Sequence, residues 1–402
     1  MEGLTSLERA CVERAIASQG AMEERTRAWA AVNSGSRNLD GLATVGAMIG
    51  EALGVLPGAL AWVQPTPVEA VDSAGKRFAL PHGRHLRLTV RAEATTQLLF
   101  TGHMDTVFAA DHAFQHVEAR GDGTWNGPGV ADMKGGIAVM LAALEAIEGA
   151  NPSFGYEIVI NSDEEVGSLA SAALLKDAAQ GKRAALTYEP AALPDGTLAG
   201  ARPGSGNFSF IVRGRSAHAG RNPEDGRNAL LAAADLALRL KAGMGPALSV
   251  NPAKIDGGSP NNVVPDLAIL RVNLRPATPE DQARAQGLIE SSVAAVAADH
   301  DVSIDTHGHF ARPPKPMTPE AEALFGLVAR AGADLGQAIR WQPTGGVCDG
   351  NNIAACGVPV IDTMGVRGGM IHSSDEYLIV DSLPERAALS ALAILRLTGT
   401  SS

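Results

Sequence analysis

Short polar motifs that contain histidine and carboxylate residues follow several apolar stretches of the chain. One apolar stretch runs into Gly102-His103-Met104-Asp105, and a second ends at Asp163-Glu164-Glu165. A third stretch ends at Glu189, and a fourth leads through a glycine-rich loop to His372. Imidazole nitrogens and carboxylate oxygens are ligands of zinc in hydrolytic sites. The pattern therefore predicts a metal site that is assembled from distant segments.

A further carboxylate, Asp132, stands in a glycine-rich segment (126–136) just before an apolar helical pattern. Glycine-rich loops often bind phosphate. Here neither the dinucleotide fingerprint nor the P-loop spacing is present, and the carboxylate of Asp132 would repel a phosphate. We therefore interpret Asp132 as a metal ligand rather than as part of a nucleotide site.

Two histidines and three carboxylates, with one more carboxylate beside them, suit a pair of zinc ions. Each ion would take one imidazole and one terminal carboxylate, and Asp132 would bridge both ions. The adjacent Glu164 and Glu165 cannot both face one metal from an extended chain, because successive side chains diverge. One of them should ligate and the other should transfer protons. Asp105 can accept the second N–H of the His103 ring and so fix its tautomer.

The elements that must position these residues alternate between strand and helix patterns. Strands are predicted over 86–90, 97–100, 156–161 and 184–188, and a buried helix over 135–147. This alternation indicates an α/β fold with a mostly parallel sheet. In such sheets ligands bind outside the carboxyl ends of the strands. The candidate ligands should therefore meet at one edge of the sheet.

The pattern changes in the middle of the chain. Predicted strands (208–212, 254–255, 267–274, 302–306) and helices (228–240, 279–298) follow the order βαββαβ, which is the ferredoxin-like unit. Proline-rich segments at 201–204 and 312–316 bound this unit and look like hinges, and the α/β pattern resumes with helices over 320–333 and 383–397. We expect a catalytic domain in two parts, 1–203 and 312–402, with an inserted α+β lid and dimerisation domain, 204–311. The alternation in 208–212 is typical of an edge strand or a half-buried strand, and we expect the inserted domain to pair with a second subunit through a sheet edge and a helix.

The composition limits the partners and the location. The chain has 402 residues and a net charge of −11, which argues against nucleic acid or an anionic membrane as a partner. No stretch reaches the roughly 18 apolar residues of a membrane helix, and the N-terminus lacks the apolar run of a signal peptide. Its 3 cysteines are too few for a disulfide framework and suit a reducing compartment. We expect a cytoplasmic protein.

Taken together, the motifs resemble those of the M20 family of metallopeptidases, and most of all its carboxypeptidase G2 (glutamate carboxypeptidase) branch. The resemblance covers nearly the whole chain. It is carried by 102–107 (GHMDTV), 132–136 (DMKGG), 163–167 (DEEVG), 216–220 (SAHAG), 262–265 (NVVP) and 372–377 (HSSDEY).

The resemblance implies a role for each residue of the site. The ligands of two Zn²⁺ ions, with Mn²⁺ or Co²⁺ as substitutes, would be His103, Asp132, Glu165, Glu189 and His372. Glu164 would be the general base, with Asp105 as a further catalytic residue beside His103. The resemblance also implies a cis peptide bond between Asp132 and Met133.

Residues of the inserted domain and of one loop would meet the substrate. In the family, the histidine matched by His218 crosses a homodimer interface and binds the oxyanion in the partner's active site. Asn262 and Arg275 would bind a substrate carboxylate, and Gly346 would line the pocket. Arg275 has an alternative structural role, which is pairing with Asp266 or Glu280.

The implied function is metal-dependent hydrolysis of an amide bond that releases a carboxylate-bearing amino acid, by a carboxypeptidase or an N-acyl-amino-acid hydrolase. One alternative is a deacylase of the acetylornithine or succinyl-diaminopimelate type, and another is a non-catalytic metal-binding relative. The stretch 306–310 (THGHF) departs from the carboxypeptidase G2 branch, which carries arginines there, so a preference for glutamate does not follow. His300, His307 and His309 suggest a third metal site only weakly, because histidines of this kind are usually at the surface.

Overall fold

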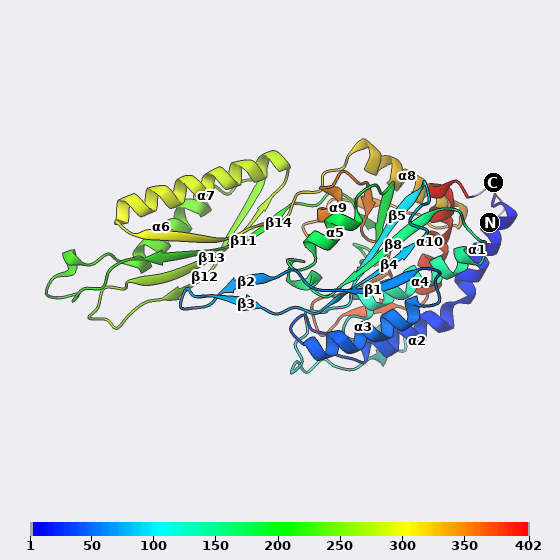
Figure 1. The fold of residues 1–402 in the computed structure, drawn as a ribbon, viewed down its shortest axis with the longest axis horizontal. Coiled ribbons are helices and arrows are strands. Elements are labelled where there is room, and N and C mark those ends of the chain that lie inside the picture. The colour runs from blue at the N-terminus through cyan, green and yellow to red at the C-terminus, as the bar shows by residue number, and fades with distance from the viewer. Residues whose placement is uncertain (1–2, 401–402) are drawn as a thin grey trace.

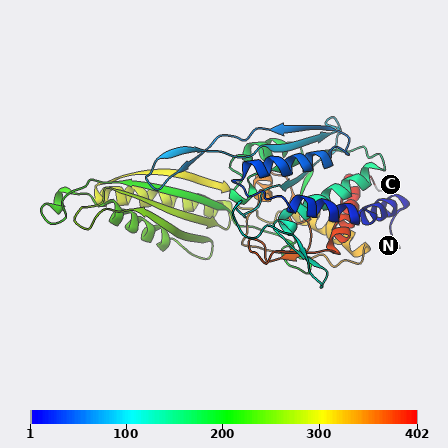
Figure 2. The same ribbon diagram turned by 90° about the horizontal axis from the view of Figure 1, so that it is seen from below.

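The computed structural model describes residues 3–400, which form an elongated molecule of two units joined along its long axis (Figure 1). The large unit carries both termini, and these lie at the end that is remote from the inserted unit (Figures 1 and 2). Within residues 3–400, no helix is both long and apolar enough to cross a bilayer.

The large unit is built on a six-stranded sheet in which three of the five strand pairings are parallel. The parallel pairings join β8, β5, β9 and β16, and the antiparallel ones add β4 and β1 at one side. This arrangement confirms the mostly parallel α/β class. In sheet order the strands are β1 (Ala59–Val63), β4 (His85–Val90), β8 (Gly155–Asn161), β5 (Gln97–His103), β9 (Ala184–Thr187) and β16 (Val360–Ile361).

Alternate residues of the central strands point to opposite sides of this sheet. Apolar side chains therefore lie on both faces, and both faces are covered. Leu98 and Phe100 pack in the main core with α4, whereas Leu99 packs in a smaller core with α5 and α9. The helix α4 is buried along most of its length, as its apolar sequence predicts. The helices of the large unit are α1 (Ser6–Ala17), α2 (Gln19–Ala30), α3 (Leu39–Leu53), α4 (Gly135–Glu148), α5 (Ala172–Ala178), α8 (Pro319–Asp334), α9 (Asp349–Ala354) and α10 (Ser382–Thr398).

The large unit also contains short strands and irregular turns outside the main sheet. The short strands form a four-stranded sheet and a separate two-stranded pair. The irregular turn η1 lies directly before α4, and the irregular turn η2 follows β8. These elements are β6 (Glu118–Ala119), β7 (Thr124–Asn126), β17 (Gly368–Gly369), β18 (Tyr377–Ile379), β10 (Leu198–Ala199), β15 (Trp341–Gln342), η1 (Val130–Lys134) and η2 (Glu164–Val166).

The inserted unit has the βαββαβ order that the sequence predicts. A four-stranded antiparallel sheet, in the order β12-β13-β11-β14, carries two helices on one face. The long helix begins with Thr278, whose hydroxyl accepts from the backbone of Asp281 while Asp281 bonds back to Thr278, a capping box. The elements are β11 (Ser205–Arg213), η3 (Pro223–Asp225), α6 (Ala229–Ala242), β12 (Leu248–Gly257), β13 (Leu267–Pro276), α7 (Pro279–His300) and β14 (Ser303–Arg312).

Of the two positions expected for the strand at 208–212, an edge strand or a half-buried strand, the edge position is wrong. These residues belong to β11, which pairs with β13 on one side and with β14 on the other. The alternation that suggested an edge has another cause: Phe208 and Phe210 face the two helices, whereas Asn207 and Ser209 face away from them. The edges of this sheet are β12 and β14.

A hairpin that the sequence did not predict reaches from the large unit onto the inserted one (Figure 1). It consists of β2 (Val68–Val71) and β3 (Arg77–Leu80). Arg77 forms an ion pair of 2.9 Å with Asp305 of β14, and Arg271 of β13 donates to the carbonyl oxygen of Val71. The hairpin therefore contacts the face of the inserted sheet that the helices leave open.

The two chain crossings between the units run side by side and are held together. Arg202 in the first crossing and Lys315 in the second pair as a β-bridge, and both side chains bind the buried carboxylate of Asp362, at 2.7 and 2.9 Å. The side-chain amide of Asn351 donates to the carbonyl oxygens of Pro203 and Pro313, at 2.9 and 2.8 Å. The crossings are thus clamped to the large unit by one carboxylate and one amide.

Candidate metal centre

His103 is the last residue of β5, where the strand delivers its side chain to the carboxyl edge of the sheet. Its Nδ1 lies 3.0 Å from the backbone oxygen of Asp105 and 3.4 Å from the Asp105 carboxylate. The hydrogen-bond acceptor at Nδ1 is thus the backbone oxygen of Asp105, whereas the predicted acceptor was its carboxylate, and the contact leaves Nε2 facing the site. The Asp105 carboxylate also accepts the backbone N–H groups of Glu164 and Glu165, at 3.1 and 3.2 Å. Asp105 therefore connects two of the predicted motifs.

Asp132 lies in the irregular turn η1, immediately before α4, and the peptide bond between Asp132 and Met133 is cis, as expected. The loop is fixed by a residue that the sequence reasoning did not single out. The carboxylate of Glu376 accepts the backbone N–H groups of Gly129, Ala131 and Asp132, at 3.0 to 3.2 Å. The only signal for Glu376 was its place inside the 372–377 motif.

The two carboxylate oxygens of Asp132 face different histidines. Oδ1 lies 3.1 Å from Nε2 of His103, and Oδ2 lies 3.3 Å from Nε2 of His372. His103 also faces Glu189 at 3.5 Å, and His372 faces Glu165 at 3.1 Å. The structure thus brings the five predicted ligands together as two imidazole–carboxylate pairs that share Asp132.

His372 adopts an unusual backbone conformation. Its φ of 64° lies in the left-handed region, which non-glycine residues rarely occupy. Such conformations cluster at functional sites, where the surroundings hold them in place. Here the conformation places a half-exposed ring opposite the buried carboxylates of Asp132 and Glu165.

The protonation states of the cluster reflect many acids buried together. Burial raises the pKa of Glu165 and of Glu189 to about 8 in each case. Hydrogen bonds to Asp132 and Glu165 raise the pKa of His372 to about 11. Burial opposes ionisation of Asp132, but hydrogen bonds from His103 and His372 more than offset it and hold the pKa of Asp132 well below its usual range. The two imidazoles of the cluster cannot balance the charge of all its carboxylates if every carboxylate is ionised.

The donor set fits divalent metal ions of the zinc type. Candidate ligand atoms of His103, Asp132 and Glu165 lie within 4.8 Å of one another, and so do those of His103, Glu164 and Glu189. Nitrogen and carboxylate oxygen are the donors of catalytic zinc sites. Buried carboxylates are costly unless they are paired or coordinate a metal, and the two imidazoles alone do not match them.

Glu164 does not share the partners of Glu165. Its Oε1 accepts a hydrogen bond of 2.6 Å from Arg312, a buried residue at the end of β14. Burial raises the pKa of Glu164 to about 8, although the charge of Arg312 acts in the opposite direction. The same guanidinium binds Asp349, at 2.9 Å. The sequence reasoning assigned no role to Arg312 or Asp349, which are visible only as a hinge arginine and a loop aspartate.

A cavity of about 220 Å³ opens beside the cluster. It is lined by Asp132, Glu165 and His372 on one side and by a loop that contains Gly346 and Cys348 on the other. Burial raises the pKa of the Cys348 thiol well above its usual value, so this cysteine stays protonated and is a poor nucleophile.

The predicted substrate-binding residues lie in two places. Arg275, in β13, donates to the carbonyl oxygen of Gly345 at 2.8 Å and so contacts the loop of Gly346. Within residues 3–400, Arg275 forms no ion pair with Asp266 or Glu280, the alternative partners that the sequence suggested. His218 and Asn262 are exposed neighbours in the inserted unit, where Ala219 bonds to the carbonyl oxygen of Asn262.

A third metal site receives no support in the part of the chain that the structure describes. The groups of ligand atoms close enough to hold an ion all include His103. His300 pairs with Asp235 at 2.9 Å, and His307 and His309 line a cavity of about 640 Å³ between the β2–β3 hairpin and the inserted sheet.

Comparison with known proteins agrees with this geometry. Residues 99–396 match Peptidase family M20/M25/M40. The chain is 31% identical to carboxypeptidase G2 of Pseudomonas sp. (strain RS-16) over 80% of its own length and 79% of that protein. It is 30% identical to succinyl-diaminopimelate desuccinylase of Maricaulis maris (strain MCS10), over 74% and 80% of the two chains.

The fold is similar to that of solved structures as well. The crystal structure of an M20-family metallo-carboxypeptidase, Sso-CP2 from Sulfolobus solfataricus, superposes with a TM-score of 0.71. The match covers 94% of this chain and 99% of that one at 12% identity, so it speaks for the fold alone.

Proposed function

The chain belongs to peptidase family M20/M25/M40, and we propose that it is a di-zinc hydrolase that cleaves an amide bond and releases a carboxylate-bearing amino acid. The observation that carries this proposal is the position of Asp132, whose two oxygens face His103 and His372 separately. A carboxylate shared between two imidazole–carboxylate pairs is suited to bridging two ions.

In this proposal His103, Glu189 and Asp132 would hold one ion, and His372, Glu165 and Asp132 would hold the other. The chemistry that the bound ions supply is a more acidic water molecule and a polarised substrate carbonyl. Glu376 keeps the Asp132 loop in place through three backbone N–H groups. Asp105 holds the His103 ring and the backbone N–H groups of Glu164 and Glu165 in fixed positions.

Glu164 is the general base of the proposed reaction. Its carboxylate lies beside the cluster but is bonded to Arg312 rather than to His372. This carboxylate would take a proton from the attacking water and later return it to the leaving amine. Within this scheme Glu165 ligates and Glu164 transfers protons.

The substrate in this proposal is an N-acyl amino acid or a peptide-like molecule with a free carboxylate. Arg275 and Asn262 of the inserted unit would bind that carboxylate when the unit closes as a lid over the cavity. Gly346 lines the cavity, and Arg275 already contacts the neighbouring Gly345. The net charge of −11 does not attract an anionic substrate at long range. The attraction must therefore come from local groups such as Arg275.

We also propose a homodimer that forms through the inserted unit. The helix α6 exposes Leu231 and Leu238, whose relative exposures are 60% and 71%, and Ile255 is exposed on the edge strand β12. Exposed apolar side chains beside an open sheet edge are typical of a two-fold interface. This surface replaces the β11 edge that the sequence suggested. The pairing would carry His218 toward the partner's metal centre.

The test is metal analysis of the purified protein together with turnover of a substrate panel. The panel contains N-acyl amino acids with acidic, neutral and basic residues, dipeptides, N-acetylornithine and N-succinyl-diaminopimelate. We expect two equivalents of zinc and hydrolysis that a chelator abolishes and Zn²⁺, Mn²⁺ or Co²⁺ restores. The last two substrates separate a carboxypeptidase from a deacylase, a distinction that the similarity to a desuccinylase makes relevant. Full metal loading with no hydrolysis on the panel would contradict the proposed function.

A further inference from the structure

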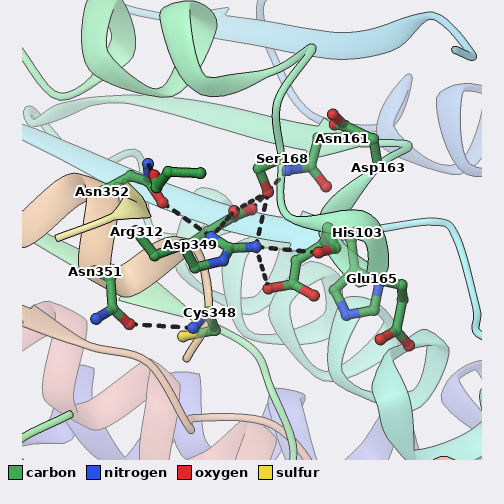
Figure 3. Close-up of polar contacts among 12 residues, drawn as sticks. His103, Asn161, Asp163, Glu165, Ser168, Arg312, Cys348, Asp349, Asn351 and Asn352 are labelled. Atoms are coloured by element: carbon green, nitrogen blue, oxygen red, sulfur yellow. Dashed lines mark hydrogen bonds and ion pairs between the residues drawn. The ribbon is translucent and has the colours of Figure 1, made fainter. Parts of the chain in front are cut away.

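Arg312 is the centre of a buried hydrogen-bond network (Figure 3). Its Nη1 donates to Asp349 and Asn352, at 2.9 Å each. Its Nη2 donates to the Glu164 carboxylate at 2.6 Å, to the Ser168 hydroxyl at 2.9 Å and to the backbone oxygen of Glu164 at 3.1 Å. One guanidinium thus holds both the side chain and the backbone of Glu164.

The backbone of Arg312 belongs to the inserted unit. It is the last residue of β14 and lies opposite Ser205, the first residue of β11. The next residue, Pro313, is already fixed to the large unit through Asn351. Arg312 therefore stands at the point where the inserted unit meets the crossings, with its guanidinium inside the large unit.

The network restricts Glu164 from two sides. Its N–H is bound by Asp105, and its carbonyl oxygen and Oε1 are bound by Arg312. A glutamate side chain that ends beside a metal centre would otherwise sample several rotamers. Since Oε1 is occupied, Oε2 is the oxygen left for proton transfer, and its direction is set by the guanidinium.

We propose that Arg312 is a positioning residue that fixes the Glu164 carboxylate for proton transfer and ties it to the second crossing between the units. The inference rests on the general-base role proposed above for Glu164. Arg312 acts through Glu164, from the point where β14 of the inserted unit joins the second crossing. Lysine cannot replace arginine fully here, because an ammonium cannot span Glu164 and Asp349 in a planar fork.

The test compares Arg312→Met and Arg312→Lys with Lys315→Met, each as the full-length metal-loaded protein. Lys315 is a matched control, because it is a buried cation of the same crossing that binds Asp362 and makes no contact with Glu164. For Arg312→Met we expect kcat to fall about 10²-fold, the loss typical of a misplaced catalytic group. KM and metal content should stay near wild type, Arg312→Lys should recover part of kcat, and Lys315→Met should keep it.

A second readout does not depend on turnover. In the metal-free protein, amide hydrogen exchange of residues 162–170 should accelerate in Arg312→Met and not in Lys315→Met. If Arg312→Met does not fold, Arg312→Lys serves for both readouts and should show the same effects to a smaller degree. A rise in KM with unchanged kcat, or equal losses in Arg312→Met and Lys315→Met, would overturn the positioning role. If Glu164→Gln itself stays active, the general-base assignment fails, whereas an inactive Glu164→Gln beside a fully active Arg312→Met refutes only the present inference.

Discussion

Glu164 and Glu165 are adjacent in the chain, yet their carboxylates have separate partners: Glu164 binds Arg312 at 2.6 Å, and Glu165 faces His372 at 3.1 Å. The divergence follows from the short turn η2, which starts at Glu164 after β8 ends. Their backbone N–H groups both bond to Asp105, so the two side chains leave a common anchor in different directions. This separation supports the proposal that Glu164 transfers protons and Glu165 binds a metal ion, and the first two predictions test it.

Replacing Glu164 with Gln should abolish turnover and leave the metals in place. The amide keeps the shape of the side chain and an oxygen that Arg312 can bind, but it cannot take up a proton. Loss of a general base costs about 10² to 10⁴ in rate. Activity and metal content are measured on the same sample, with Glu145→Gln, which removes a partner of Arg25 far from the site, as control. A parallel loss of metal and activity would count against the assignment.

Replacing Glu165 or His372 with Ala should lower the zinc content. Each change removes one of the few ligands of an ion, and the remaining donors are too few for tight tetrahedral binding. Zinc is counted by elemental analysis after dialysis. His309→Ala, in the inserted unit, should keep the wild-type content. Two full equivalents of zinc in Glu165→Ala or His372→Ala would remove these residues from the ligand set.

Metal binding should release protons and should tighten as the pH rises. In the metal-free protein the pKa of His372 is raised to about 11 and that of Glu165 to about 8, so both groups hold protons at neutral pH. Metal ligands must be deprotonated, so an ion that binds His372 and Glu165 displaces these protons and binds more tightly at higher pH. The number of protons released is measured by calorimetric titration in two buffers of different ionisation enthalpy. The titrations are repeated between pH 6 and 9. A proton count of zero across that range would contradict the prediction.

Asp362→Asn should destabilise the fold near neutral pH. Burial alone would raise the pKa of Asp362, but Arg202 and Lys315 lower it to about 2. A folded-state pKa below the unfolded value contributes stability above the unfolded pKa, and the contribution disappears as the pH falls through the folded value. Removing one partner of a buried ion pair typically costs about 3 to 5 kcal/mol.

Thermal unfolding of the wild type and of Asp362→Asn checks this prediction. The difference in Tm should be largest near pH 7 and should shrink between pH about 4 and about 2, the interval between the two pKa values. Asp111→Asn, an exposed aspartate, should show no such difference. Equal Tm values for wild type and Asp362→Asn at pH 7 would mean that the clamp at the crossings does not stabilise the molecule.

Mixed dimers should recover activity from two inactive parents. If His218 serves the partner's centre, His218→Ala and Glu164→Gln chains are each nearly inactive. A mixed dimer has one site with both intact Glu164 and the partner's intact His218. A random mixture should then return about a quarter of wild-type activity, given independent sites and free exchange. A mixture as inactive as its parents, with exchange shown by labelled subunits, would place His218 in its own subunit's chemistry or in none.

Local pattern was enough to predict most of the fold. The apolar run 97–100 predicted β5, and the apolar run after Gly135 predicted α4. The βαββαβ order of the inserted unit was also confirmed. The position of β11 in the sheet was not, because alternation reports which face of a strand is buried and not which strands lie beside it. The β2–β3 hairpin was missed because its side chains are mostly exposed or half-buried, which gives no clear period.

The sequence by itself determined which chemistry the site can perform, because ligand-type residues stand directly after apolar strands and parallel strands bring their carboxyl ends to one edge. The family resemblance of the motifs named His103, Asp132, Glu165, Glu189 and His372, which the tertiary structure brings together around Asp132. Only the tertiary structure decided what supports them: Glu376 under the Asp132 loop and Arg312 against Glu164. Glu376 and Asp132 are far apart in the chain, as are Arg312 and Glu164. No local sequence pattern, such as an apolar period or a turn motif, predicts either contact. Such contacts arise from packing of whole units, whereas strand and helix patterns arise from the spacing of neighbouring side chains.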